Sequence, residues 1–369
     1  MSVTQLAISR FRNITQLQLE PGPGFNCIIG PNGSGKTAIL EALHFLGLGR
    51  SFRTNQPGRA IRDGDSDFVL FARQQEGQQQ HQLGMQRDRG GNISLRLDGA
   101  TPERLSRFAE VLPLQLITPE SFELLTGGPA NRRQFVDWGV FHVDNQFFAC
   151  WSRVKRLLKQ RNALLKRRPK RYDELSYWDA ELARFAQQLT VLRQQYVNDL
   201  LPALAPMLER LLPRYQVALE FSAGWDSNLP LNEVLAGQFE RDLALGFTQA
   251  GPHKADLRIK ADGTPVQELF SRGELKLLVC ALKLAQAALL KDRQQRQITF
   301  LIDDLPAELD SDKRLALTAA LADTQAQVFV TAIDADKVDD MVAPLSDVRL
   351  FHVERGQLVG PSNDNKRDG

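Results

Sequence analysis

The sequence contains few cysteines and no long uninterrupted hydrophobic run, and these absences exclude several classes of protein. The three cysteines are Cys27, Cys150 and Cys280. They lie far apart in apolar or aromatic surroundings, so we expect neither disulfides nor a cysteine metal cluster. The longest apolar stretch, residues 275–290, is interrupted by Lys276 and Lys283 and is too charged to cross a bilayer. The N-terminal residues alternate polar and apolar, unlike a signal peptide. These features predict a cytoplasmic protein without a membrane segment.

The chain also lacks a charge imbalance. It has 369 residues, 43% of them hydrophobic, and a net charge of only +2. This is the composition of a globular protein with one large or two medium domains. The net charge alone therefore says nothing about nucleic acid, and the distribution of the charges matters more.

One octapeptide fits the phosphate-binding pattern G-x-x-x-x-G-K-[ST]. Its residues are Gly30, Pro31, Asn32, Gly33, Ser34, Gly35, Lys36 and Thr37. An apolar run at 25–29 predicts a buried strand before it, and residues 38–43 predict a helix after it. Backbone amides and the helix N-terminus would then face phosphate oxygens, with Lys36 on the β- and γ-phosphates and Thr37 on Mg²⁺. A chance glycine-rich turn is the alternative. We expect a site that binds a nucleoside triphosphate with Mg²⁺.

A second pattern is the hydrophobic strand 298–302, which ends in Asp303 and Asp304. In P-loop enzymes such an acidic strand end holds magnesium. We expect Asp303 to hold Mg²⁺ through water, and Asp304 to orient or deprotonate the attacking water. Solvated loop carboxylates are the alternative interpretation.

A third pattern, residues 270–274, opens an amphipathic helix. Ser271 and Gly273 suit a helix N-terminus that contacts a phosphate. Since one P-loop already serves the nucleotide, this second helix end is best explained by contact with a neighbouring subunit's nucleotide. The alternative is a plain capping box between Ser271 and Glu274.

A dense basic run suggests an anionic partner. It contains Arg153, Lys155, Arg156, Lys159, Arg161, Lys166, Arg167, Arg168, Lys170 and Arg171. No acidic residue interrupts it, whereas a solvated helix usually mixes charges of both signs. We expect sequence-independent binding of a nucleic-acid backbone. A solvated helix face is the alternative.

The hydrophobic pattern predicts an α/β fold with a projecting helical hairpin. Strand signals in 3–20 and 67–97 indicate an antiparallel sheet beside the P-loop. An apolar stripe from Trp178 to Tyr196 predicts a long helix that pairs with a helix at 151–166, and Pro202 and Pro206 are expected to break or kink it. Alternating strands and helices after 263 predict a parallel sheet. The expected divisions are 1–110 (first part of an ATPase lobe), 111–262 (a helical lobe with the arm at about 151–200) and 263–369 (second part of the ATPase lobe).

The combination resembles ABC-type ATPases of the SMC kind, and among them the bacterial RecF family. The segments that carry the resemblance are the P-loop, 119–120, 127–129, 132–137, 251–256, 271–274, 301–304 and 307–310. They extend over nearly the whole chain. Asp304 stands where glutamate is usual, and Glu274 where glutamine is commoner.

The resemblance implies roles for these residues. Lys36, Thr37, Asp303 and Asp304 would bind and hydrolyse ATP with Mg²⁺, and Ser271 and Gly273 would contact the partner subunit's nucleotide. Glu308 to Asp310 would cross the dimer interface, Thr331 would stand at a transporter ATPase's switch histidine, and Gln115 is a tentative metal ligand.

The implied function is an ATP-driven homodimer that clamps single-stranded gaps and ss–ds DNA junctions in repair, recombination and replication restart. It would recruit RecO and RecR, aid RecA loading and support SOS induction. DNA-stimulated hydrolysis would be slow, because Asp304 is short. Two alternatives remain: a transporter ATPase subunit, disfavoured by the basic hairpin and the absent switch histidine, and an ATP-gated binding module with vestigial hydrolysis.

Overall fold

The computed structural model describes residues 1–304, 310–333, 338 and 341–359. The chain forms two compact units: residues 1–121 with 280–369, and residues 122–279. We call them the first and the second unit. The sequence had placed its divisions earlier along the chain, at 110 and 262.

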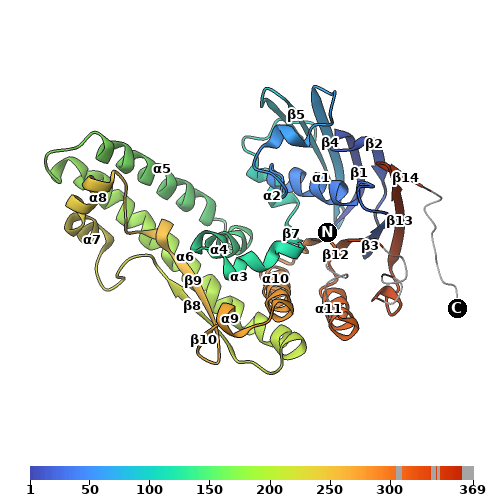
Figure 1. The fold of residues 1–369 in the computed structure, drawn as a ribbon. Helices are drawn as coiled ribbons and strands as arrows, with labels where there is room; N and C mark the ends of the chain where they lie inside the picture. The colour runs from blue at the N-terminus through green and yellow to red at the C-terminus, as the bar shows by residue number, and fades with distance from the viewer. Residues whose placement is uncertain (305–309, 334–337, 339–340, 360–369) are drawn as a thin grey trace. The chain divides into compact units, whose positions relative to one another are not determined.

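The first unit contains a parallel sheet and an antiparallel sheet (Figure 1). The six-stranded sheet has the order β14-β13-β3-β12-β11-β7, in which β3, β7, β11, β12 and β13 run parallel and β14 is antiparallel. Its strands are β3 (Phe25–Ile29), β7 (Leu114–Ile117), β11 (Thr299–Ile302), β12 (Gln327–Ala332), β13 (Val348–Glu354) and β14 (Gln357–Leu358). Strands β3, β11 and β12 are buried throughout, as expected for a sheet covered on both faces. The predicted parallel sheet is confirmed.

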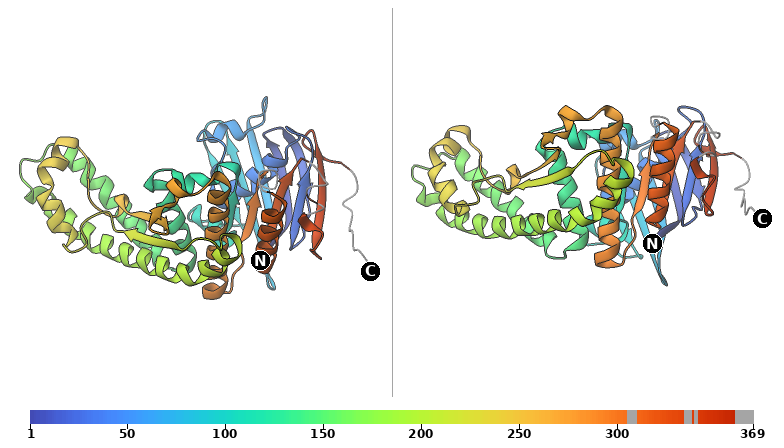
Figure 2. Two further views of the ribbon diagram at one scale, coloured as in Figure 1. Left: turned by 60° about the horizontal axis from the view of Figure 1, so that its bottom comes forward. Right: turned by 90° about the horizontal axis from the view of Figure 1, so that it is seen from below.

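The second sheet of this unit is antiparallel, as the sequence indicated, with the order β2-β1-β4-β5-β6. Its strands are β1 (Ser2–Phe11), β2 (Ile14–Leu19), β4 (Asp67–Glu76), β5 (Gln79–Asp88) and β6 (Ile93–Leu97). The helical elements of the first unit are α1 (Lys36–Leu48), η1 (Pro57–Ala60), α2 (Ser106–Val111), η2 (Pro119–Phe122) and α11 (Ser311–Asp323). Helix α11 lies on the opposite face of the parallel sheet from α1 (Figures 1 and 2).

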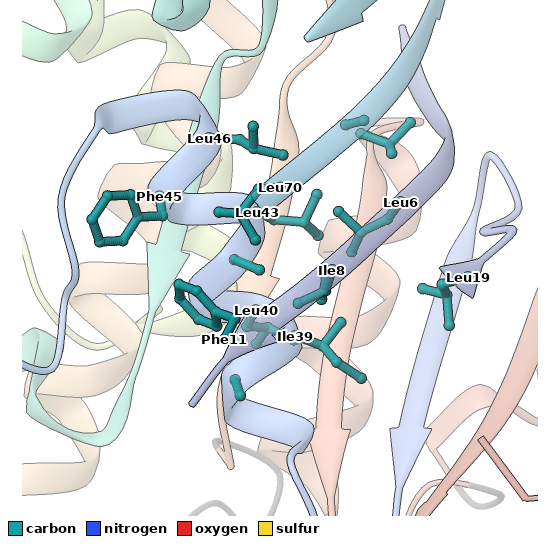
Figure 3. Packing of buried hydrophobic residues seen from close by; sticks show 14 of the residues in the cluster. Leu6, Ile8, Phe11, Leu19, Ile39, Leu40, Leu43, Phe45, Leu46 and Leu70 are labelled. Carbon is teal, nitrogen blue, oxygen red and sulfur yellow. The ribbon is translucent and has the colours of Figure 1, made fainter. Parts of the chain in front are cut away.

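The main core of the first unit surrounds helix α1 (Figure 3). Ile39, Leu43 and Phe45 of α1 are fully buried among side chains of both sheets. Phe45 contacts Phe11 and Phe68 edge to face, with ring centroids 6.1 and 5.1 Å apart. Such burial stabilises by roughly 1.5–3 kcal/mol per large apolar side chain. The helix that begins at the P-loop is thereby fixed between the two sheets.

The second unit is mostly helical, and α5 and α6 lie side by side in every view (Figures 1 and 2). The helices are α3 (Glu123–Thr126), α4 (Pro129–Val143), α5 (Phe147–Lys166), α6 (Asp173–Leu211), α7 (Leu231–Gly237), α8 (Phe239–Leu245), η3 (Pro252–Lys254) and α9 (Val266–Leu269). A three-stranded antiparallel sheet adds β8 (Val217–Ser222), β9 (Asp256–Ala261) and β10 (Thr264–Pro265). Helix α10 (Arg272–Gln294) begins in this unit and ends in the first.

The prolines were expected to break or kink α6, and the expectation of a break was wrong. The helix continues through Pro202 and Pro206 to Leu211. Both prolines are exposed, whereas Leu200 and Leu204 on the other face are fully buried. Packing of the apolar stripe therefore offsets the backbone hydrogen bonds that the prolines remove.

Among the described residues, none of the helices is apolar over enough length to cross a membrane.

Candidate functional site

The P-loop lies between the buried strand β3 and helix α1, as the sequence predicted. Gly33 and Gly35 have φ angles of 75° and 116°, in the left-handed region that favours glycine. At Gly30 a side-chain carbon would lie 2.2 Å from the carbonyl oxygen of Val353. The loop is held from outside, because Asn13 Nδ2 donates to the Gly33 carbonyl (2.9 Å) and the Gly356 amide to the Ser34 carbonyl (2.7 Å). Its curled backbone is therefore preformed.

Lys36 is buried at the start of α1, and its Nζ forms hydrogen bonds to two backbone carbonyls. Its Nζ donates to the carbonyl oxygens of Gly30 (2.7 Å) and Pro31 (3.0 Å). Burial lowers the pKa of Lys36, while the carboxylates of Asp304 and Asp303 act in the opposite direction. A cation held this way can exchange two carbonyls for phosphate oxygens without breaking an ion pair.

Asp303 lies at the end of β11 and connects three elements. Its Oδ1 accepts hydrogen bonds from Thr37 Oγ1 (3.0 Å) and Thr331 Oγ1 (2.7 Å), and the Asp303 amide donates to the Ile117 carbonyl. Burial raises the pKa of Asp303, the two threonine hydroxyls lower it, and the Asp304 carboxylate raises it. A carboxylate and a hydroxyl oxygen at this distance are ligands that Mg²⁺ prefers.

Asp304 follows in a left-handed conformation, with φ of 48°. Its amide donates to Thr331 Oγ1 at 3.0 Å, so one hydroxyl positions both aspartates. Its Oδ1 is buried without a hydrogen-bond partner among the described residues. A strained backbone and an unpaired acceptor are features that collect at functional sites. Glu308 and Leu309 lie outside the described residues, and Asp310 caps α11 by accepting from the Lys313 amide.

Lys36, Thr37 and Asp304 border one cleft of about 700 Å³ in the first unit. It is lined by Asn32 to Ala38 and Asp304, and also by Arg12, Asn13, Arg53, Arg59, Ile61, Arg62 and Asp63. The prediction that the P-loop and the acidic strand end lie together is confirmed by the hydrogen bond from Thr37 to Asp303. The sequence did not reveal the arginines, which no spacing marks. Of these arginines, Arg12 has the nearest thing to a sequence signal, because it lies between the two strand patterns at the N-terminus. In the structure it forms a bidentate pair with the buried Glu41 (2.6 and 2.9 Å).

Gln115 is not at this cleft, so its tentative role as a metal ligand is not carried forward. It is buried in the middle of β7, level with Phe300 and before the strand end. Its Nε2 donates to Gln286 Oε1 (2.7 Å), and its Oε1 accepts from Lys283 Nζ (3.1 Å). Both ends of the amide thus bind α10.

The third sequence pattern, residues 270–274 in the second unit, forms the capping box that was the plain alternative. Ser271 Oγ donates to Glu274 Oε2 (2.7 Å), and the Ser271 amide donates to the same oxygen (2.9 Å). Tyr215 Oη donates to Glu274 Oε1 at 2.9 Å. Gly273 follows Ser271 in the first turn of α10. In this state the serine proton is directed at a carboxylate.

The basic run on the arm is divided by the fold, and one of its members was wrongly assigned to DNA. Arg161 has no exposed surface and binds Asp179 (2.7 Å) and Asp242 (2.6 Å). Arg153 is half-buried beside Glu181 at 3.3 Å. The remaining eight cations are exposed: Lys155, Arg156, Lys159, Lys166, Arg167, Arg168, Lys170 and Arg171. The prediction failed for Arg161 because its counterions come from α6 and α8, beyond the basic run.

Comparison with known proteins decides the family. The model of the RecF/RecN/SMC N-terminal domain matches residues 2–357. A DNA replication and repair protein RecF from Shewanella piezotolerans is 49% identical over 97% of this chain and 99% of its own length. One from Shewanella baltica is 50% identical over the same shares. The chain belongs to the RecF family. This membership does not favour the transporter alternative.

Solved structures agree with the RecF family fold. A structure described as the recombination mediator protein RecF-ATPrS in the RecFOR pathway has a TM-score of 0.85 at 22% identity, and covers 97% of each chain. An Smc head bound to the C-terminal winged-helix domain of ScpA has a TM-score of 0.63 at 14% identity, covering 99% of this chain and 98% of that one. The mixed α/β head predicted from the sequence is confirmed.

Proposed function

We propose that this protein is a cytoplasmic ATP-dependent DNA-binding protein of recombinational repair, in which slow ATP hydrolysis times the release of DNA. The observation that carries the proposal is that Lys36, Thr37 and Asp304 line one cleft, with Asp303 hydrogen-bonded to Thr37 behind it. The chain that holds this cleft belongs to the RecF family. The proposal includes RecO and RecR as partners, RecA loading, replication restart and SOS induction, and membership of the RecF family supports it.

In the proposed mechanism, residues 30–37 bind the ATP phosphates. The loop amides and the N-terminus of α1 face the phosphate oxygens, and Lys36 Nζ leaves its two carbonyl partners for the β- and γ-phosphates. Thr37 Oγ1 and Asp303 are placed to hold Mg²⁺, which would neutralise developing phosphate charge. The free Oδ1 of Asp304 accepts a hydrogen bond from the attacking water and aims it at the γ-phosphate. Because aspartate is one methylene shorter than glutamate, we expect slow turnover.

The proposed DNA grip depends on a head-to-tail dimer. Ser271 and Gly273 at the start of α10 would contact the γ-phosphate bound to the second copy, so that ATP closes the dimer and hydrolysis opens it. The eight exposed cations of the arm would bind DNA phosphates without reading bases. Single-stranded gaps and ss–ds junctions are the proposed targets.

The test is binding to a gapped duplex with and without MgATP at fixed salt. Three variants sharpen it: Lys36→Ala for nucleotide binding, Asp304→Asn for hydrolysis, and Arg167→Ala with Arg168→Ala for the arm. Arg293→Ala, an exposed cation of the first unit, controls for loss of charge. The wild type should bind more tightly with ATP, Lys36→Ala should lose that gain, and Asp304→Asn should keep it while single-turnover hydrolysis falls roughly 10²–10³-fold.

Each part of the proposal has its own contrary result. Equal binding with and without ATP would leave only a basic arm, and no binding would overturn the DNA function. Hydrolysis unchanged by Asp304→Asn would support the alternative of a vestigial enzyme. The arm variant should also reduce the slope of log affinity against log salt by up to about two, because each lost phosphate contact removes roughly one.

A further inference from the structure

Two large apolar side chains are exposed together beside the arm, where α8 ends. Leu245 is 49% exposed and Phe247 is 44% exposed, with Gly246 between them. Figure 1 shows α8 beside the far end of α5. Single exposed apolar residues are common and need no explanation. A neighbouring pair on a rigid turn within a basic surface is less ordinary.

The turn is held in place by buried polar contacts. The Thr248 amide and Oγ1 both donate to Asn162 Oδ1 of α5, at 2.9 and 2.7 Å. Arg161 Nη1 donates to Thr248 Oγ1 (2.9 Å), and the Gln249 amide donates to Asp242 Oδ1 (3.0 Å). The backbone at Phe247 is therefore fixed before any ligand arrives. A ring presented in this way loses little conformational freedom on binding.

The surroundings of the Phe247 ring are cationic. Lys254 Nζ lies 5.8 Å from the ring centroid. A side-chain carbon at Gly246 would lie 3.9 Å from Lys166 Cγ, so the turn also adjoins the start of the exposed cations at 166–171. The carboxylates at that end are engaged locally, since Asp173 pairs with Arg171 (3.8 Å) and Glu174 accepts from the Lys170 amide. The ring thus borders the most basic part of the arm.

We propose that Phe247 is a stacking residue for an unpaired DNA base, and that Lys166 and Lys254 bind phosphates of the same strand. The inference rests on the proposed DNA-binding function and assigns to Phe247 the contact with the unpaired bases of its single-stranded targets. Any base can stack on an aromatic face, while cations follow the backbone. A duplex keeps its bases stacked and offers the ring no face. Lysines are depleted in the cores of protein–protein interfaces, so charge favours nucleic acid over a protein segment here.

The test compares single strand and blunt duplex of equal length, with the full chain at fixed salt. Phe247→Leu removes the aromatic face but keeps an apolar side chain, Phe247→Trp restores the face, and Leu245→Ala is the matched control on the same turn. Phe247→Leu should weaken single-strand binding by roughly 5- to 150-fold, with duplex affinity and the salt slope unchanged. Phe247→Trp should recover the loss, and Leu245→Ala should change little.

A spectroscopic measurement separates stacking from apolar contact. With 2-aminopurine in the single strand, the wild type and Phe247→Trp should quench its fluorescence, and Phe247→Leu should not. Unchanged single-strand binding by Phe247→Leu, equal loss on both DNAs, or an equal loss in Leu245→Ala would overturn this inference alone. The last result would mean that the turn contacts DNA as an apolar surface and not through the aromatic face. A wild-type chain that binds neither DNA overturns the proposed function as well.

Discussion

The cleft of the first unit and the arm of the second unit both bury a cation, but they surround it differently. Lys36 contacts two neutral carbonyl oxygens, with the nearby carboxylates not bonded to it. Arg161 is enclosed by two carboxylates and a threonine hydroxyl. The first arrangement leaves a charge available to a ligand. The second satisfies the charge inside the fold, so burial of a cation by itself does not mark a site.

The largest effect that we predict is on the buried cluster of the arm. Burial alone would lower the pKa of Arg161, but hydrogen bonds and charge interaction with Asp179 and Asp242 raise it. Arg161→Ala leaves two buried carboxylates without a cation and should reduce the free energy of unfolding by about 3–5 kcal/mol. Urea denaturation followed by circular dichroism measures it. Arg156→Ala, exposed on the same helix, should stay within about 0.5 kcal/mol of the wild type.

A second variant isolates the charge from the packing. Arg161→Met combined with Asp179→Asn and Asp242→Asn removes all three charges while keeping most of the volume. It should recover part of the loss, because paired buried ions contribute little once their desolvation is counted. If the single and the triple variant are equally unstable, the hydrogen bonds of the Arg161 guanidinium, rather than the pairing of charges, hold this part of the arm.

A smaller effect is predicted for His44, a buried ionisable group on the helix that follows the P-loop. Its Nδ1 lies 2.9 Å from the Arg50 carbonyl oxygen, and burial lowers its pKa to about 4. The folded protein therefore favours the neutral form of the His44 imidazole. The contribution of neutral His44 to the free energy of unfolding is complete above the unfolded pKa of about 6.5. It is lost as the pH falls toward 4, by roughly 3 kcal/mol in total.

The His44 prediction is measured with His44→Gln, which cannot titrate. Urea denaturation at several pH values between 7 and 4 should show a wild-type stability that falls more steeply than that of the variant. Equal slopes would mean that His44 accepts a proton in the folded state. In that case a single carbonyl partner would be enough to hold a charge in this unit, which would weaken the contrast drawn with Arg161.

The P-loop, the acidic strand and the two sheets of the first unit could be predicted because they are local patterns with one backbone solution. Gly33 and Gly35 mark left-handed positions, and a buried strand ending in Asp303 points at the sheet edge where the loop lies. Arg161 and Gln115 could not be predicted, since their partners Asp242 and Gln286 are distant in the sequence. The free acceptor on Asp304 also depends on the tertiary position of Thr331.

The smallest effect that we predict concerns Glu274. Its carboxylate lies at the helix end where we propose that the partner subunit's γ-phosphate binds, and it repels that phosphate. Its Oε2 lies 2.7 Å from Ser271 Oγ, and Tyr215 holds its other oxygen. Glu274→Gln retains a capping-box side chain but removes a negative charge from the helix end that would meet the γ-phosphate. Dimerisation with MgATP, measured by sedimentation velocity in an Asp304→Asn background, should strengthen by roughly two- to five-fold.

Ser271→Ala is the matched opposite of Glu274→Gln. It removes the hydroxyl, which costs about 1 kcal/mol of cap energy, and should weaken the ATP-dependent dimer while leaving nucleotide binding to the P-loop unchanged. If Glu274→Gln weakens the dimer as Ser271→Ala does, the carboxylate serves the contact by positioning the serine. Glu274 would then be a third kind of charged group, beside Lys36 in the cleft and Arg161 in the arm. Its charge is partly exposed to solvent, and the dimer contact would require its ionised form.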